Sequence, residues 1–137
     1  MRNQRVLRML IITDIVLTVL LIISELALQS TLPAPLRKWL DDWGEPSLSP
    51  IQMLVLALFL VTISVGMIAW IALYNFWKYG PPLYVAAWIL SVIGTALSGP
   101  SVMTSAGATL ELLETVVAGM ILGIVYFSDL RARFGAP

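Results

Sequence analysis

Four long apolar runs, separated by short polar segments, occupy most of the chain. They cover about residues 6–28, 51–75, 82–98 and 106–128. A helix needs about 20 apolar residues to cross the hydrocarbon core of a bilayer, which is about 30 Å thick. The third run is the shortest, and Pro81 and Pro82 stand at its start. The pattern predicts an all-α integral membrane protein, a four-transmembrane-helix bundle formed by a single domain of residues 1–137.

A shorter amphipathic pattern lies between the first two runs. Leu36, Trp39, Leu40 and Trp43 follow the spacing i, i+3, i+4, i+7 and therefore share one face of a helix. Charged residues take the opposite face. A helix with these two faces lies flat in the membrane interface. We therefore expect a short interfacial helix at about residues 36–43 in the first external loop, serving as a surface anchor or as a lid or docking surface.

The composition agrees with a membrane protein and restricts the chemistry. Hydrophobic residues make up 59% of the chain and charged residues 12%, whereas soluble domains have about 25% charged residues. The chain has neither Cys nor His, which excludes disulfides, thiolate metal sites, Cys/His nucleophiles and His-ligated haem. The formal net charge is zero, and no basic patch indicates nucleic acid. We expect no enzymatic activity, no cofactor and no metal.

Three arginines, Arg2, Arg5 and Arg8, precede the first apolar run. This order is typical of a signal peptide, but the apolar part of a signal peptide has only about 7–15 residues. The first run is longer, and small residues do not stand where a cleavage site requires them. We therefore expect a retained signal-anchor helix.

The basic residues are distributed unevenly between the two sides of the predicted bundle. If all four runs span, six of the eight bases lie on the side of the two termini, and only two lie on the other side. The positive-inside rule places the side with more bases in the cytoplasm. We expect a multi-pass protein of the cytoplasmic (inner) membrane with both termini in the cytoplasm. The six bases are Arg2, Arg5, Arg8, Lys78, Arg131 and Arg133.

Aromatic residues are concentrated near the predicted cytoplasmic side. Such residues often form a belt at the level of the lipid headgroups. We expect the same for this group and for Tyr84, near the start of the third run. The belt residues are Trp70, Tyr74, Phe76, Trp77, Tyr79, Tyr126 and Phe127.

Four carboxylic acids, Asp14, Glu25, Glu111 and Glu114, lie inside the apolar runs, and no base lies at the same depth. An ionisable group in hydrocarbon is costly and is a functional-site hypothesis by default. Asp14 and Glu25 are eleven residues apart, close to three helical turns, so they share one face of the first helix. Glu111 and Glu114 are neighbours on one face of the fourth. If these two helices touch, the acids form a ladder across the membrane.

Different explanations apply to different acids. Glu25 and Glu111 can reach the external headgroups or pair with the bases of the first external loop. Asp14 and Glu114 lie deeper, so they must be neutral or hydrogen-bonded to Thr and Ser on neighbouring helices. A proton or cation pathway and pairing with a base of another membrane subunit are the other two explanations. Glu114 is the deepest by residue count, and we expect it to matter most.

Small residues in the runs indicate close helix packing. Gly119 and Gly123 form a GxxxG pair, which permits two helix backbones to approach closely. Gly66 in the second run and Gly94 in the third can serve in the same way. We expect these four glycines at helix contacts, either within the bundle or with another protein.

The leading functional hypothesis is a non-enzymatic accessory or scaffold subunit that acts through helix–helix contacts. The alternative is a homo-oligomeric small transporter coupled to protons or cations through Asp14 and Glu114. The expected partners are the lipid bilayer and either another membrane protein or further copies of the chain.

Overall fold

The computed structural model describes residues 2–28, 31–43, 50–98 and 102–134, and for residues 39–43 it describes the backbone only. Within these ranges the chain is helical and contains no strand. Four of the helices are long and apolar enough to cross a membrane, so the prediction of an all-helical chain with four possible spans is confirmed. The elements are α1 (Arg2–Leu28), α2 (Ala34–Trp43), α3 (Pro50–Tyr74), α4 (Gly80–Ser98), α5 (Ser105–Phe127) and the 3-10 helix η2 (Asp129–Phe134).

Helices α1 and α4 begin before the starts predicted for their spans. Helix α1 begins four residues earlier than the predicted span, so Arg2 and Arg5 belong to its first turns. Helix α4 begins at Gly80, which brings Pro81 and Pro82 into its first turn. Proline is tolerated there because the N–H groups of the first turn have no partner within the helix. With 19 residues, α4 is about 28 Å long and close to the thickness of the hydrocarbon core.

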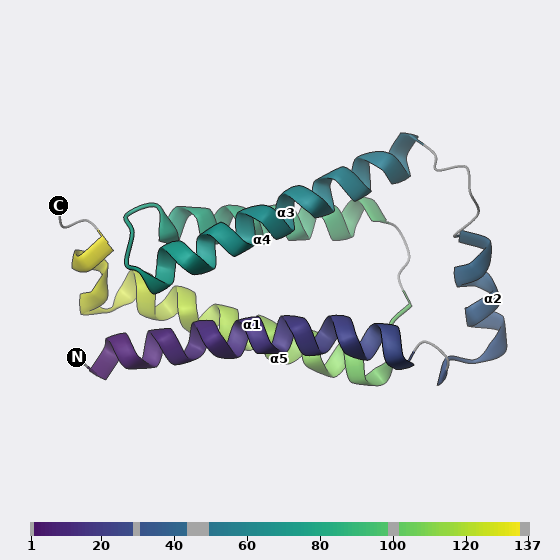
Figure 1. Ribbon diagram of the computed structural model, residues 1–137, viewed down its shortest axis with the longest axis horizontal. Helices are drawn as coiled ribbons and strands as arrows, with labels where there is room; N and C mark the ends of the chain where they lie inside the picture. The colour runs from purple at the N-terminus through teal and green to yellow at the C-terminus, as the bar shows by residue number, and fades with distance from the viewer. Residues whose placement is uncertain (1, 29–30, 44–49, 99–101, 135–137) are drawn as a thin grey trace.

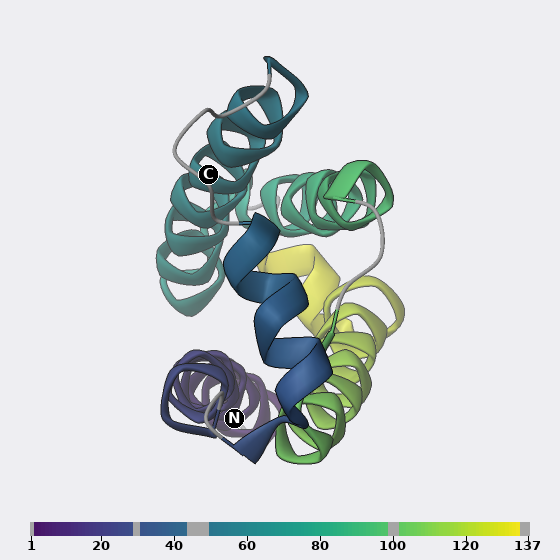
Figure 2. The same ribbon diagram turned by 90° about the vertical axis from the view of Figure 1, so that its right-hand side faces the viewer.

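The four long helices form two pairs. Helix α1 lies along α5, and α3 lies along α4. The two pairs touch each other much less than the helices within each pair do. Figure 2 shows the two pairs from the end of the bundle, with α2 crossing that end. The fold is therefore a bundle of two layers, each made of two helices.

The buried apolar side chains gather in the half of the bundle that carries both termini. Toward α2 the helices α1 and α3 diverge (Figure 1), and most large apolar side chains there are exposed. This exposure is expected where lipid, which is as apolar as the side chains, surrounds the helices. The buried cluster consists of Leu7, Ile11, Ala69, Leu73, Tyr84, Ala118, Ile121, Val125, Leu130 and Phe134.

A tight turn joins α3 to α4 at this end. The Trp77 N–H donates to the Ala72 carbonyl at 2.8 Å, and the Phe76 N–H donates to the Leu73 carbonyl at 3.2 Å. This pair of hydrogen bonds is the Schellman arrangement, which ends many helices and needs a left-handed residue that is usually glycine. Here the left-handed residue is Phe76, with a φ of 57°, at a cost of about 1–2 kcal/mol.

The ring of Phe76 makes contacts that offset this cost. Its centroid lies 5.5 Å from that of Phe134 in η2. The guanidinium of Arg8 lies 5.5 Å from the Phe76 centroid and 4.8 Å from that of Tyr74. The turn is thus held against both α1 and the C-terminal η2.

Gly80 allows α4 to start directly against the end of α3. A Cβ atom on Gly80 would lie 2.9 Å from the backbone N of Leu73 and 3.0 Å from the backbone C of Ala72. Backbone atoms cannot move aside as the end of a side chain can. We expect Gly80→Ala to lower the free energy of unfolding by about 1–3 kcal/mol, the usual cost of overpacking, measured as a lower melting temperature in detergent.

Gly119→Ala is the matched control for this substitution. Among the described residues, no atom outside the local helix backbone lies within 4 Å of a Cβ built on Gly119. The control should melt at or slightly above the native temperature, since alanine favours a helix over glycine. Equal melting of the two variants would contradict the close contact at Gly80.

Most of the glycines expected at helix contacts have no close neighbour among the described residues of this bundle. Within the described part of the chain, a Cβ on Gly66, Gly119 or Gly123 meets no neighbour within 4 Å, and one on Gly94 lies 3.8 Å from Leu58 Cδ2. The interpretation of the first three as contacts within this bundle is therefore corrected. Their use in contact with another copy or another protein stays a prediction.

The amphipathic helix predicted at residues 36–43 is present as α2 and begins two residues earlier. It runs across the end of the bundle, transverse to the long helices (Figures 1 and 2). Leu36 is 38% exposed. The side chains of Trp39, Leu40 and Trp43 lie outside the described ones, so the position of the tryptophan face in the membrane interface stays a prediction.

Candidate functional site

Asp14 of α1 is almost completely buried, with 3% of its surface exposed. One carboxyl oxygen, Oδ2, accepts two hydrogen bonds. The Trp70 Nε1–H of α3 donates to it at 2.9 Å, and the Tyr84 hydroxyl of α4 donates to it at 2.8 Å. The side chain of Asp14 therefore joins three helices.

The second oxygen of Asp14 has a different environment. Oδ1 is buried and has no hydrogen-bond partner among the described residues. A buried acceptor without a partner costs about 1–3 kcal/mol, and such an atom in a native fold calls for an explanation. Because both donors point at Oδ2, Oδ1 is the oxygen that is free to bind a proton.

Glu114 of α5 lies close to this carboxyl group. Its Oε1 is 2.7 Å from the hydroxyl of Thr18, one turn beyond Asp14, and the same hydroxyl is 3.0 Å from the Asp14 carbonyl. We call this group the acid cluster: Asp14, Thr18, Trp70, Tyr84 and Glu114. Each of the four long helices supplies at least one of its members.

Glu25 lies at the other end of α1 and has a structural contact. Its Oε1 accepts from the backbone N–H of Thr104 at 3.2 Å and from the Thr104 hydroxyl at 2.9 Å. Thr104 is the N-cap of α5, and its hydroxyl oxygen accepts from the Gly107 N–H at 3.0 Å. A carboxylate at a helix N-terminus is also favoured by the helix dipole. Glu25 thus faces α5 and not the bases of the external loop, which corrects that expectation.

Glu111 is exposed on the surface of α5. Its carboxylate has no hydrogen bond or ion pair within the part of the chain that the structure describes. The expected ladder of acids is therefore incomplete: Asp14, Glu25 and Glu114 lie between α1 and neighbouring helices, whereas Glu111 faces the surroundings. The contact of α1 with α5, on which the ladder depends, is present.

Sequence reasoning missed the two donors to Asp14. It placed Trp70 in the cytoplasmic aromatic belt and Tyr84 at the headgroup level, but Tyr84 is 4% exposed and bonded to the acid. The depth of each residue, counted from the end of its helix, could have revealed these two donors. Trp70 lies four residues before the end of α3 and Tyr84 four residues after the start of α4, about 6 Å inward, and Asp14 lies about 9 Å inward from Arg8.

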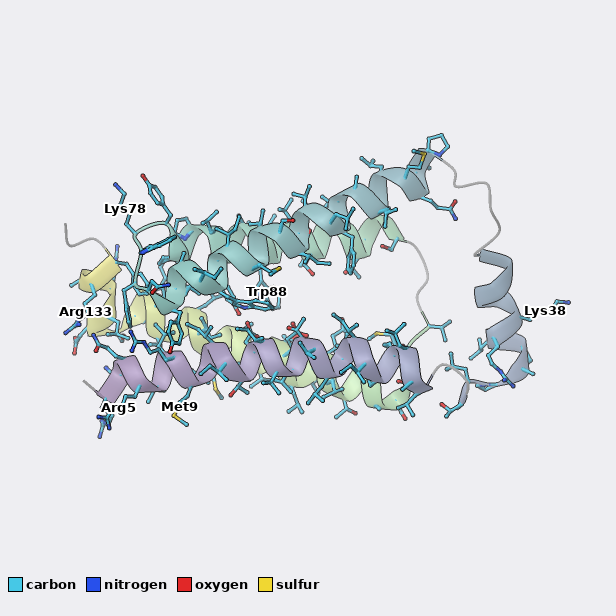
Figure 3. The ribbon with its side chains drawn as sticks, in the orientation of Figure 1. Arg5, Met9, Lys38, Lys78, Trp88 and Arg133 are labelled. Carbon is cyan, nitrogen blue, oxygen red and sulfur yellow. The ribbon has the colours of Figure 1, made fainter. Side chains whose placement is uncertain are left out.

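An apolar groove opens beside the acid cluster. It has a volume of about 230 Å³ and is formed by α4 and one residue of α5. Trp88 in its wall lies beside Tyr84, and its side chain extends from α4 toward the layer of α1 and α5 (Figure 3). The lining residues are Val85, Trp88, Ile89, Val92, Ile93 and Leu122.

The described side chains do not form a metal site, because no three carboxylates within these ranges are close enough to hold one ion. No protein-family model, curated protein or solved structure matches this chain. The functional argument therefore rests on the geometry of the acid cluster.

Proposed function

We propose that this protein is a proton-coupled membrane carrier in which Asp14 takes up and releases the proton. The observation that carries the proposal is the asymmetry of its carboxyl group: Oδ2 accepts from Trp70 and Tyr84, and the buried Oδ1 has no described partner. The two donors hold the side chain in one orientation, so the same oxygen atom would receive the proton in each cycle.

The position of the acid cluster supports a role in coupling. Its members come from all four long helices, and the two helix pairs have few contacts with each other. Adding or removing a proton on Asp14 changes which hydrogen bonds the group can make. A ligand shifts a conformational equilibrium only through different interactions with the two states, and these hydrogen bonds would supply that difference.

Glu114 is the second acid of the proposed pathway. It is partly buried, and Thr18 lies between its carboxylate and the backbone of Asp14. The Thr18 hydroxyl holds the Glu114 carboxyl group against α1, one helical turn from Asp14. The apolar groove beside Tyr84 offers a surface where a substrate could approach from the lipid.

Proton movement in liposomes tests the proposal. The purified protein is reconstituted with a pH-sensitive dye inside, and a pH gradient is applied together with candidate substrates. Glu114→Gln should slow proton movement by about a hundredfold or more, the lower end of the effect usual for losing a positioned proton-transfer group. Glu111→Gln removes the same charge from the outer surface of α5 and should leave the rate unchanged. Equal rates in both variants would contradict a role for Glu114.

An accessory subunit is the second candidate function. It is favoured by α5, where Glu111, Gly119 and Gly123 recur at multiples of four residues. Glu111 is exposed, and a Cβ on either glycine meets no described neighbour within 4 Å. A carboxylate that faces lipid favours a polar partner. Extraction in mild detergent followed by mass spectrometry would reveal another membrane protein bound in a fixed ratio, whereas a carrier should purify as this chain alone.

We propose that the end with both termini faces the cytoplasm. Arg5, Lys78 and Arg133 lie at this end and Lys38 at the other (Figure 3), as the positive-inside rule requires. Cysteines replacing the exposed residues Ala34 and Ala132 would be treated with an impermeant thiol reagent in cells whose outer surface is accessible. We expect labelling of Ala34→Cys only, and labelling of Ala132→Cys only would reverse the orientation.

A further inference from the structure

A polar hollow lies between the first turn of α1 and η2, at the end of the bundle with both termini. Its volume is about 370 Å³, which is large enough for a small charged group. Two of its lining residues are arginines and one is an aspartate. The lining residues are Arg2, Asn3, Gln4, Asp129, Leu130 and Arg133.

The wall formed by η2 is fixed to the rest of the protein. Leu130 and Phe134 are buried, with 5% and 6% of their surfaces exposed. The side-chain oxygen of Gln4, in the amide orientation that satisfies both groups, accepts from the guanidinium of Arg133, with Nε at 3.0 Å. Arg133 is exposed, and this contact holds its guanidinium at the edge of the hollow.

The charges in the hollow do not cancel. It contains the guanidinium groups of Arg2 and Arg133 and the carboxylate of Asp129, which gives a net charge of +1. No ion pair joins these three groups in the described structure. A guanidinium presents planar, directed N–H donors that match the oxygen atoms of a phosphate, so the hollow has the charge and the donors for such a group.

The hollow also lies close to the start of the apolar surfaces of α1 and α5. On α1 the apolar surface begins at Val6, two residues after the last lining residue, Gln4. On the other side Phe127, with 92% of its surface exposed, precedes η2 by two residues. These apolar residues would face acyl chains, which places Arg2 and Arg133 at the phosphate layer.

We propose that this hollow binds the phosphate of an anionic phospholipid of the surrounding leaflet. Arg2 and Arg133 would bind the phosphate oxygens, and Asn3 and Asp129 would bind the hydroxyl groups of a polyol headgroup such as glycerol. The net charge of +1 is complementary to a headgroup of net charge −1. This proposal is independent of the proton chemistry of Asp14.

Native mass spectrometry of the detergent-purified protein tests the proposal. Phosphatidylglycerol is titrated, and the apparent dissociation constant of the first bound lipid is measured. Arg2→Gln and Arg133→Gln should each weaken binding about fivefold, the factor expected for the loss of one basic residue near an anionic lipid. Arg5→Gln is the matched control, since it removes the same charge at the same end of the molecule (Figure 3) but lies outside the hollow.

Arg5→Gln should leave the affinity unchanged, and all three variants should melt at the native temperature. If Arg5→Gln weakens binding as much as the other two, general surface charge accounts for the effect and the site is overturned. Asp129→Asn should change the affinity for phosphatidylglycerol in the opposite direction. It removes a negative charge from the wall, so binding of phosphatidylglycerol should become tighter or stay equal.

Three other ligands show whether the hollow binds the phosphate of an anionic lipid, a free phosphate compound or a zwitterionic lipid. Inorganic phosphate and glycerol phosphate should compete only weakly, because they lack acyl chains. Competition as strong as by the lipid would overturn the assignment to a lipid. Phosphatidylethanolamine should bind more weakly than phosphatidylglycerol. If the native protein binds phosphatidylethanolamine more tightly and Asp129→Asn does not, the hollow binds a zwitterionic headgroup. That result would overturn the proposal.

Discussion

Asp14→Asn should fold at close to the native stability and lose proton movement in liposomes almost completely. The asparagine side chain has nearly the same shape, and its amide oxygen can accept from Trp70 and Tyr84 as Oδ2 does. The amide does not take up or release a proton in this pH range. The substitution therefore separates the structural part of Asp14 from its proposed chemical part.

The measurement combines a melting curve in detergent with the rate at which an imposed pH gradient decays in liposomes. Thr13→Val is the control, because Thr13 is the exposed neighbour of Asp14 and its hydroxyl bonds only to its own helix. The control should keep both properties. Native proton movement in Asp14→Asn would remove this residue from the proposed mechanism.

Asp14→Leu should be strongly destabilising. Leucine has a similar size but no acceptor, so the Trp70 N–H and the Tyr84 O–H would lose their partner inside the bundle. A buried donor left unpaired costs about 1–3 kcal/mol, and the two together therefore cost about 2–6 kcal/mol. We expect a large fall in melting temperature and in resistance to unfolding by sodium dodecyl sulfate, compared with Asp14→Asn.

A double variant separates the hydrogen bonds from other effects of leucine. Tyr84→Phe added to Asp14→Leu removes one of the two unpaired donors together with its partner, and replacing both partners is often nearly neutral. The double variant should recover part of the lost stability. If Asp14→Leu is as stable as Asp14→Asn, the two hydrogen bonds contribute nothing to the fold.

The sequence predicted the helices well because their signal is local. Runs of apolar residues, ended by glycine, proline and polar residues, determine how many segments can span a bilayer and nearly where each begins. The cap of α5 is also a local feature, because Thr104 accepts a hydrogen bond from Gly107, three residues later in the sequence. The amphipathic spacing around Leu36 identified α2 in the same way.

The lateral packing of the helices could not be predicted, because every long helix is apolar on all sides. In a soluble bundle the polar face shows which side is outward, but in lipid both sides are equally apolar. The glycines at positions 119 and 123 were therefore expected at helix contacts either within the bundle or with another protein. Among the described residues, no neighbour lies within 4 Å of a Cβ built on either of them. The contact between α1 and α5 was considered only as the condition for a ladder of acids, because both helices carry acidic residues.

The choice between Asp14 and Glu114 shows the same limit. Depth counting made Glu114 the more important acid, because depth follows from position along one helix. Burial follows from the neighbouring helices, and these enclose Asp14 more completely than Glu114. Tyr84, which has 4% of its surface exposed, is one of the side chains that cover Asp14.

The gathering of buried side chains at one end of the bundle has a mechanical consequence. This cluster can serve as a pivot about which the pair of α3 and α4 turns against the pair of α1 and α5. Helix α3 has 25 residues and is about 37 Å long, so a rotation of about 10° around the pivot would move its far end by about 6 Å. Asp14 lies beside the pivot. A small change in its hydrogen bonds there would produce a much larger displacement at the far end of α3. Helix α2 lies between α1 and α3 in the chain, at the end where these two helices diverge. It would therefore move when α3 moves relative to α1.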